Sequence, residues 1–249
     1  MKDSKQEYNL GAEGYQRATQ RQLRKFAYEP TLRANIPDLK SKRVIDIACG
    51  EGISSRIMLN SGAREIVGVD ISEELIEKAQ AFQTPNIRYH VRDAIHESLK
   101  DFGKYDVVTA IMYLHYASSK DDLKLAIKNI GNVLTPDGLF YGMTVNPNLL
   151  REGYQDYGIK ITPMGSSEGS RVKTELHSLD WEKFCEFSNY HWSQKTYDTI
   201  FQNEGFETKW HKGIVSDDGI KKFGNDFWKK YKQEPIYWTM TAKKVKISK

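Results

Sequence analysis

The chain lacks the features that mark several classes of protein. It has only two cysteines in 249 residues, Cys49 and Cys185, so neither a disulfide framework nor a cysteine metal site is expected. No apolar run approaches the roughly 18 residues that a membrane-spanning helix needs. The first residues are polar and do not contain the apolar stretch of a signal peptide. We therefore expect a cytoplasmic protein without membrane contact.

A strong charge of one sign is also missing. The net charge is +4, which is too small for a dedicated nucleic-acid binder. The densest basic run, residues 243–249, is typical of a solvated terminus. The six histidines show no H-x₃-H spacing that would pair them as metal ligands. We expect no nucleic-acid partner and no metal.

What the chain does have is a strand, a turn of small residues and a helix start within residues 44–59. Glycines at Gly50 and Gly52 let backbone N–H groups approach a ligand closely. A second apolar strand, residues 66–70, ends in Asp70. An acid at that place can accept both hydroxyl groups of a ribose. The two features together indicate a cofactor that contains a nucleoside.

Two cofactors compete for this turn. The pattern Gly50-x-Gly52-x-x-Ser55 is close to the fingerprint that binds the pyrophosphate of NAD. However, Asp46 precedes the turn and Glu51 lies within it, and these carboxylates would repel a pyrophosphate. They would attract the ammonium group of S-adenosylmethionine, which carries a ribose and no phosphate. The residues predict S-adenosylmethionine; the alternative for Asp46 is that it only caps the turn.

The run Asp-Ile-Ala-Cys-Gly-Glu-Gly at 46–52 resembles the D-x-G-x-G-x-G motif of class I S-adenosylmethionine-dependent methyltransferases, with Ala48 in place of the first glycine. Further similarities to this family follow in order: the ribose-binding strand end at 68–72, the adenine-contacting acid in Arg92-Asp93-Ala94, the fourth strand at 105–110 and the L-x-P-x-G turn at 134–138. The resemblance covers residues 8–145 well. Residues 15–19, 45–52 and 114–117 are similar to small-molecule enzymes of the toxoflavin N-methyltransferase type.

Strands and helices alternate through the first two thirds of the chain. Strands are expected at 43–47, 65–69, 87–91, 105–111 and 139–145, with a terminal pair at 206–212 and 235–243. This alternation is typical of an α/β protein with a doubly wound, mostly parallel sheet. The resemblance implies a Rossmann-like sheet of seven strands in the order 3-2-1-4-5-7-6. We expect residues 1–249 to form a single methyltransferase domain.

Two segments fall outside the alternation. Residues 1–40 are expected to form an N-terminal helical lid, with a helix over 11–27 and with Pro30 and Pro37 breaking the helical pattern after residue 27. Residues 146–193, after the fifth strand, are rich in glycine, proline and aromatic residues. A long segment of this kind is typical of a functional insertion, here expected to cover the substrate. The alternative is that its aromatic side chains only pack the insertion onto the body.

The resemblance, together with the rule that ligands bind at the carboxyl ends of the strands, assigns a set of residues to the cofactor. The expected cofactor-binding residues are Tyr15, Asp46, Ala48, Gly50, Gly52, Asp70, Ile71, Asp93, Ala94 and Ala110. Tyr15, in the N-terminal segment, would cover the methionine end; the alternative is that it is ordinary surface packing.

Residues just after the fourth strand would face the transferred methyl group. His115 and Tyr116 are the candidate catalytic residues, with His115 as a base of near-neutral pKa. An ordinary histidine at a helix start is the alternative. Tyr113, together with His177 and Trp181 of the insertion, is expected to line an apolar substrate pocket.

These features predict methyl transfer to N or O of a small aromatic or heterocyclic acceptor, by a monomer or a homodimer. An RNA or protein methyltransferase on the same fold is one alternative, and an inactive cofactor-binding module is another. The charge argues against RNA. The residues after the fourth strand also argue against RNA. Enzymes that methylate planar amino groups usually have an Asn/Asp-Pro-Pro-Tyr/Phe motif there, whereas this chain has Ala-Ile-Met-Tyr at 110–113.

Overall fold

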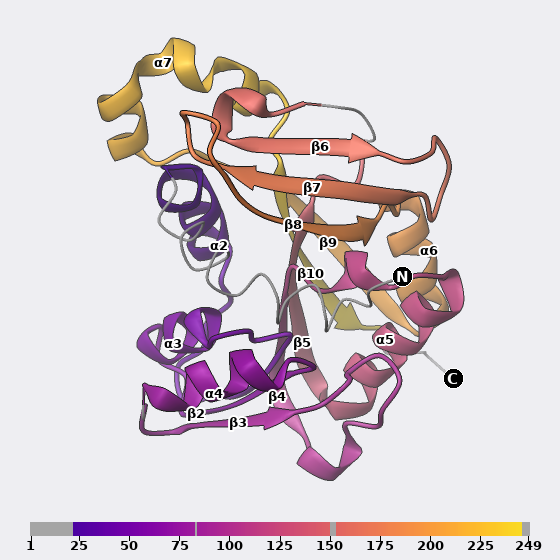
Figure 1. Cartoon of the computed structure of the whole chain (residues 1–249). Coiled ribbons are helices and arrows are strands. Elements are labelled where there is room, and N and C mark those ends of the chain that lie inside the picture. The colour runs from indigo at the N-terminus through magenta and orange to yellow at the C-terminus, as the bar shows by residue number, and fades with distance from the viewer. Residues whose placement is uncertain (1–21, 83, 150–152, 246–249) are drawn as a thin grey trace.

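The computed structural model describes residues 22–82, 84–149 and 153–245. Seven strands form one sheet (Figure 1), and their order is β3 (Ile87–Val91), β2 (Glu65–Asp70), β1 (Arg43–Ile47), β4 (Tyr105–Ile111), β5 (Leu134–Val145), β10 (Tyr237–Lys244) and β9 (Phe206–Lys212). Neighbours among β1 to β5 are parallel, and β10 runs antiparallel to both β5 and β9. The predicted fold class and the strand order implied by the resemblance are confirmed.

Helices cover both faces of this sheet, as the alternation predicts. Helices α3 (Ile53–Asn60) and α4 (Glu73–Ala81) lie on one side, and α5 (Lys120–Val133) and α6 (Gln194–Asn203) lie on the other (Figure 1). Serine side chains cap the first turns of α4, α5 and α6, where backbone N–H groups have no helical partner. No helix of the described residues combines the length and apolarity that a membrane crossing requires.

Strand β5 begins earlier than predicted. Leu134 already pairs with Tyr105, and the next pair in the register is Val107 with Leu139. The intervening residues therefore form a bulge inside the strand rather than a turn that precedes it. A Cβ atom on Gly138 would lie 2.8 Å from the Leu134 side chain, so glycine is the residue that lets this bulge close.

The chain is helical from residue 22 through η1 (Arg24–Tyr28), a π-type segment, into α2 (Glu29–Ala34). The prediction that Pro30 breaks the helix is wrong. Pro30 lies in the first turn of α2, and the wider π turn that precedes it accommodates a residue that has no N–H group.

This helical segment is part of the core. Leu23, Phe26 and Ala27, predicted to share one face, are all buried. The Tyr141 hydroxyl of β5 donates a hydrogen bond of 2.5 Å to the carbonyl oxygen of Leu32. The described part of the expected lid is therefore anchored to the sheet. Residues 1–21, which contain Tyr15, lie outside the described residues.

The insertion after β5 forms a second sheet that the sequence analysis did not predict. Strands β6 (Ile159–Pro163), β7 (Arg171–His177) and β8 (Lys183–Tyr190) are antiparallel in the order β6-β7-β8 and lie across one end of the main sheet (Figure 1). The signal is an alternation in β7: Val172, Thr174 and Leu176 are buried, and the residues between them are half-buried.

Helix α7 (Asp217–Gln233) is the other unpredicted element. Gly224 adopts φ 80° and kinks it, which interrupts the helical pattern in the sequence. The ring of Phe223 contacts Phe26 of η1 with centroids 5.9 Å apart. On the same helix, Trp228 stacks on Tyr157 of η4 (Gln155–Tyr157), with centroids 5.6 Å apart and planes 9° apart. Helix α7 thus joins the N-terminal helix to the insertion.

We expect Tyr157→Phe to loosen this junction. The Tyr157 hydroxyl donates to the carbonyl oxygen of Phe227 and accepts from the backbone N–H of Tyr231, each at 2.9 Å. Phenylalanine keeps the stacked ring but removes both hydrogen bonds from the insertion to α7, so the free energy of unfolding should fall by about 1–3 kcal/mol in urea titration. Tyr190→Phe, which removes a hydroxyl with no hydrogen bond to a described residue, is the control. Equal stability of the two variants would contradict this reading.

Candidate functional site

The turn after β1 winds through the left-handed region of backbone space three times. Ala48, Gly50 and Gly52 have φ angles of 57°, 55° and 79°. A Cβ atom on Gly52 would collide with the hydroxyl group of Tyr89, which reaches under the turn from β3. Gly50 donates its N–H to Asp70 Oδ2 at 2.8 Å. The turn is therefore fixed from below, and its backbone faces the carboxyl ends of the strands.

Asp46, at the end of β1, is fully buried beneath this turn. Its carboxylate accepts hydrogen bonds from Ser54 and Ser55 of α3 and from Thr109 of β4, each at 2.7 Å. Burial raises the pKa of Asp46, and the three hydroxyl donors oppose that shift. These contacts are the ones that the turn-capping alternative predicts. They also keep a carboxylate close to the backbone of the turn.

Asp70 lies at the end of β2 next to the turn. Its Oδ2 accepts from Gly50 N, and its Oδ1 accepts from Ser72 N at 2.9 Å. The backbone N–H of Ile71 also contributes a hydrogen bond to this carboxylate, so the side chain is held mainly by backbone donors. Burial is the main cause that raises the pKa of Asp70, and the backbone donors counteract it. Ile71, which follows, is half-buried.

Asp93 follows β3, the strand beside β2. It accepts from the backbone N–H groups of Ile95 and His96 at 3.0 and 3.2 Å, and its Oδ2 lies 2.8 Å from His96 Nδ1. The hydrogen bond to Asp93 raises the pKa of His96. Ala94 is buried beside it, and Ala110 of β4 pairs with Ile47 of β1. The predicted cofactor residues from Asp46 to Ala110 thus lie at the same edge of the sheet.

His115 lies on η3 (Leu114–Tyr116), the short helix after β4. Its side chain is buried, and Nδ1 lies 3.1 Å from Thr144 Oγ1. Its Nε2 has no hydrogen-bond partner among the described residues. Burial lowers the pKa of His115 to about 3, so the expectation of a near-neutral pKa is wrong. The Tyr116 ring lies 4.7 Å from the imidazole, centroid to centroid.

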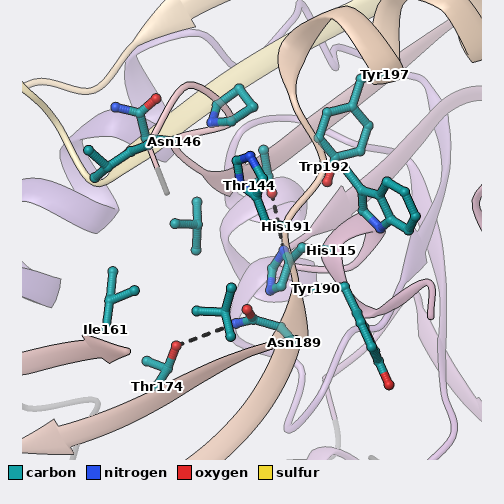
Figure 2. A pocket seen from close by; sticks show the side chains of 14 residues that line it. His115, Thr144, Asn146, Ile161, Thr174, Asn189, Tyr190, His191, Trp192 and Tyr197 are labelled. Atoms are coloured by element: carbon teal, nitrogen blue, oxygen red, sulfur yellow. Dashed lines mark hydrogen bonds between the residues drawn. The ribbon is translucent and has the colours of Figure 1, made fainter. Parts of the chain in front are cut away.

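A small cavity opens beside His115, between the ends of β4 and β5 and the second sheet (Figure 2). Its lining residues are His115, Thr144, Val145, Asn146, Pro147, Leu149, Ile161, Val172, Thr174, Asn189, Tyr190, His191, Trp192 and Tyr197. The cavity measures about 30 Å³, which is room for about two water molecules. This is less than the space that a metabolite fills.

The other residues predicted to line the substrate pocket lie elsewhere. Tyr113 is packed in the core; its hydroxyl has no partner among the described residues, and burial together with the charge of Asp93 raises its pKa. His177 and Trp181 lie at the turn between β7 and β8, with ring centroids 4.6 Å apart. His177 Nε2 there contacts Glu175 at 3.1 Å. The structure does not bring these three residues into the cavity that His115 lines.

Several residues of the cavity were missed by the sequence analysis, above all Thr144, Asn189 and Trp192. Thr144 lies near the carboxyl end of β5, two strands from β1, which is where the switch-point rule places ligands. Trp192 follows β8 and donates its indole N–H to the carbonyl oxygen of Ala117 at 2.9 Å. Among the described parts of the chain, no cluster of three or more His, Cys, Asp or Glu side chains could hold a metal ion.

Comparison with known proteins identifies relatives of one kind. A family model described as a methyltransferase domain matches residues 15–209. A ubiquinone biosynthesis O-methyltransferase of Coxiella burnetii (strain RSA 331 / Henzerling II) is 31% identical over 150 residues, which are 57% of this chain and 62% of the relative. One of Neisseria meningitidis serogroup C (strain 053442) is 28% identical over 160 residues, 59% of each chain. The chain thus spans less than two thirds of the curated relatives it matches.

Solved structures share the fold at low sequence identity. A S-adenosylmethionine dependent methyltransferase from Mesorhizobium loti superimposes with a TM-score of 0.65 and 19% identity, over 91% of this chain and all of that one. One from Clostridium acetobutylicum ATCC 824 gives a TM-score of 0.60 and 16% identity, over 88% and 96% of the two chains.

We expect Ala48→Gly to stabilise the protein. Ala48 holds a Cβ atom at φ 57°, where an L-residue is strained and glycine is not. The free energy of unfolding should rise by up to about 1 kcal/mol in urea titration, after the entropy cost of glycine is subtracted. Ala79→Gly in α4, where the backbone is helical, is the matched control and should lose about 1 kcal/mol or more. A lower free energy of unfolding in both variants would contradict the claim that the backbone of Ala48 is strained.

The buried neutral His115 predicts how stability depends on pH. Its folded pKa, about 3, lies below the ordinary value of 6.5, so the unfolded chain binds one more proton between these values. The contribution is fully present above pH 6.5 and is lost as the pH falls toward 3. Between pH 6 and 4 the unfolding free energy of the wild type should fall more steeply than that of His115→Gln, by up to about 1.4 kcal/mol per pH unit. Parallel curves would show that His115 is protonated in the folded protein.

Proposed function

The chain belongs to the methyltransferase-domain family and has the fold of class I S-adenosylmethionine-dependent methyltransferases, and on this premise we propose that it methylates N or O of a small aromatic or heterocyclic acceptor. The observation that carries the proposal is the cavity beside His115. It is closed by an insertion in the chain, and it contains no lysine, arginine or carboxylate side chain. A face for RNA would instead be open and basic.

The cofactor fits the turn in three respects. Residues 48, 50 and 52 have left-handed backbone angles. At the two glycines no side chain covers the backbone, so a ligand can approach it closely. Asp70, a carboxylate at the end of β2 beside the turn, lies where it can accept from a ribose hydroxyl group. The hydroxyl group of Tyr113 is buried and has no hydrogen-bond partner among the described residues. The charge of Asp93 contributes to its raised pKa, so the two groups are near each other. Such an unpaired hydroxyl group could bind the polar edge of an adenine. We assign Asp46 to the methionine end of the cofactor, because its carboxylate lies under the turn and would attract the ammonium group.

S-adenosylmethionine supplies a methyl group that is already activated on its sulfonium. In the transfer, a bond forms between the methyl carbon and the acceptor atom, the carbon–sulfur bond breaks with its electron pair staying on sulfur, and the proton of the acceptor is released. The protein has to align the acceptor and exclude water. We assign the acceptor to the space beside His115 and Tyr116, because these residues follow β4 and lie on η3.

Relatives give this proposal its chemical direction. Those reported above are named O-methyltransferases of ubiquinone biosynthesis, which favours an aromatic hydroxyl among the possible acceptors. The likeness to toxoflavin N-methyltransferases favours nitrogen instead. Incubation with methyl-labelled S-adenosylmethionine and either a metabolite extract or bulk tRNA distinguishes the classes. Label in small molecules supports the proposal, label in tRNA or in protein contradicts it, and cofactor binding without turnover would identify an inactive binding module.

Cofactor binding can be tested at Asp70. Calorimetry should show that S-adenosylhomocysteine binds the wild type and that Asp70→Ala binds it more weakly, by about 1–3 kcal/mol for lost hydrogen bonds to a charged group. Asp218→Ala, in the exposed first turn of α7, is the control and should bind like the wild type. Tight binding of NAD with no response to S-adenosylhomocysteine would refute the choice of cofactor.

A further inference from the structure

Three buried side chains from different elements meet at one end of the cavity (Figure 2). Tyr197 of α6 and Thr144 of β5 line the same end of the cavity. Thr144 Oγ1 lies 3.1 Å from Nδ1 of His115 on η3. None of the three is more than 3% exposed. The other imidazole nitrogen, Nε2, is buried, belongs to a residue that lines the cavity, and has no partner among the described residues.

The supply of hydrogens in this group decides which nitrogen carries the proton. If the proton is on Nε2, Thr144 donates to Nδ1, and only Nε2–H is left without a partner among the described residues. If the proton is on Nδ1, Thr144 can only accept from it. The Thr144 hydroxyl hydrogen then has no acceptor among the described residues, and Nε2 is also unpaired. The first arrangement leaves fewer buried polar groups unsatisfied, and such groups are costly.

We propose that Thr144 is a positioning residue that holds His115 as the Nε2–H tautomer, so that the imidazole offers a hydrogen-bond donor to the cavity and does not act as a base. The ring stays neutral because it is buried, so its single N–H is the only hydrogen that it can offer. The proton that the acceptor releases during methyl transfer goes to water.

This assignment names the chemical class of group that the cavity takes, and this step rests on the proposed function. A donor at Nε2 selects a group that accepts a hydrogen bond. The fourteen lining residues include no lysine, arginine, aspartate or glutamate, so a carboxylate, phosphate or ammonium group would lie there without a counter-charge. The group beside His115 is therefore an uncharged hydrogen-bond acceptor, such as a carbonyl or hydroxyl oxygen or an unprotonated ring nitrogen.

Nitrogen NMR of the full chain labelled with ¹⁵N-histidine tests the tautomer directly. The His115 signals are assigned by their loss in His115→Gln. The wild type should carry its proton on Nε2 over Nδ1 by at least about ten to one, the ratio that one unsatisfied buried group implies. Thr144→Val should lower that ratio several-fold, and Thr144→Ser should restore it. Tyr197→Phe, which removes a hydroxyl that does not contact His115, should leave the ratio above the Thr144→Val value.

A proton on Nδ1 in the wild type, or the same ratio in Thr144→Val and the wild type, would overturn the assignment. The tautomer does not depend on turnover, so this test can succeed or fail separately from the proposed function. The class of group is tested with two fragments in the presence of S-adenosylhomocysteine. Acetophenone, whose oxygen only accepts, should shift the Nε2–H proton signal, and pyrrole, whose N–H only donates, should not. A response to pyrrole alone, or to neither, would refute the class.

Discussion

The buried carboxylate of Asp46 is the constraint on which the candidate site depends. It joins three elements, because its donors are Ser54 and Ser55 at the start of α3 and Thr109 in β4, while Asp46 itself ends β1. A charge removed from water is tolerated only when hydrogen bonds surround it, and here hydroxyl groups supply them. The result is a turn with fixed left-handed residues whose backbone faces the edge of the sheet where Asp70 and Asp93 also lie.

The second sheet gives the site its other wall. Strands β6 to β8 bring Thr174 and Asn189 over the end of β5, and Trp192 fastens the insertion to Ala117 just after η3. At the opposite end, Tyr157 fastens it to α7 through two backbone hydrogen bonds. These two anchors hold the second sheet over His115, and the burial of the imidazole lowers its pKa.

The parallel part of the fold could be predicted because its signals are local. Strands at 43–47, 87–91 and 105–111 have the predicted bounds, and so does the antiparallel strand at 206–212, because each is a short apolar or alternating run. Ser72 caps α4 as expected. The second sheet and α7 escaped because their partners are distant in the sequence. Gly224 hides the periodicity of α7, and the glycines and prolines of 146–193 hide the alternation in β7.

The residues at the carboxyl ends of β1, β2 and β3 could be picked out from the sequence, whereas most residues that line the cavity could not. Spacing from the turn locates Asp46, Gly50, Asp70 and Asp93, whereas the cavity depends on which residues of a distant sheet cover His115. Trp181, chosen as an aromatic residue of the insertion, lies in a turn at the other end of that sheet and is 45% exposed. Composition cannot distinguish the two ends of a sheet, and only the register of β7 with β8 does so.

Central to the proposed function is that the cofactor binds at the turn after β1, where Asp70 and Asp93 also lie. Backbone amide NMR during titration with S-adenosylhomocysteine tests this most directly. The account predicts that the largest shifts occur at residues 48–52, 70–72 and 93–95, with smaller ones at 113–116, and that β9 and α7 stay unchanged. Binding that shifts none of the first three segments, or that shifts mainly β9 or α7, would contradict it.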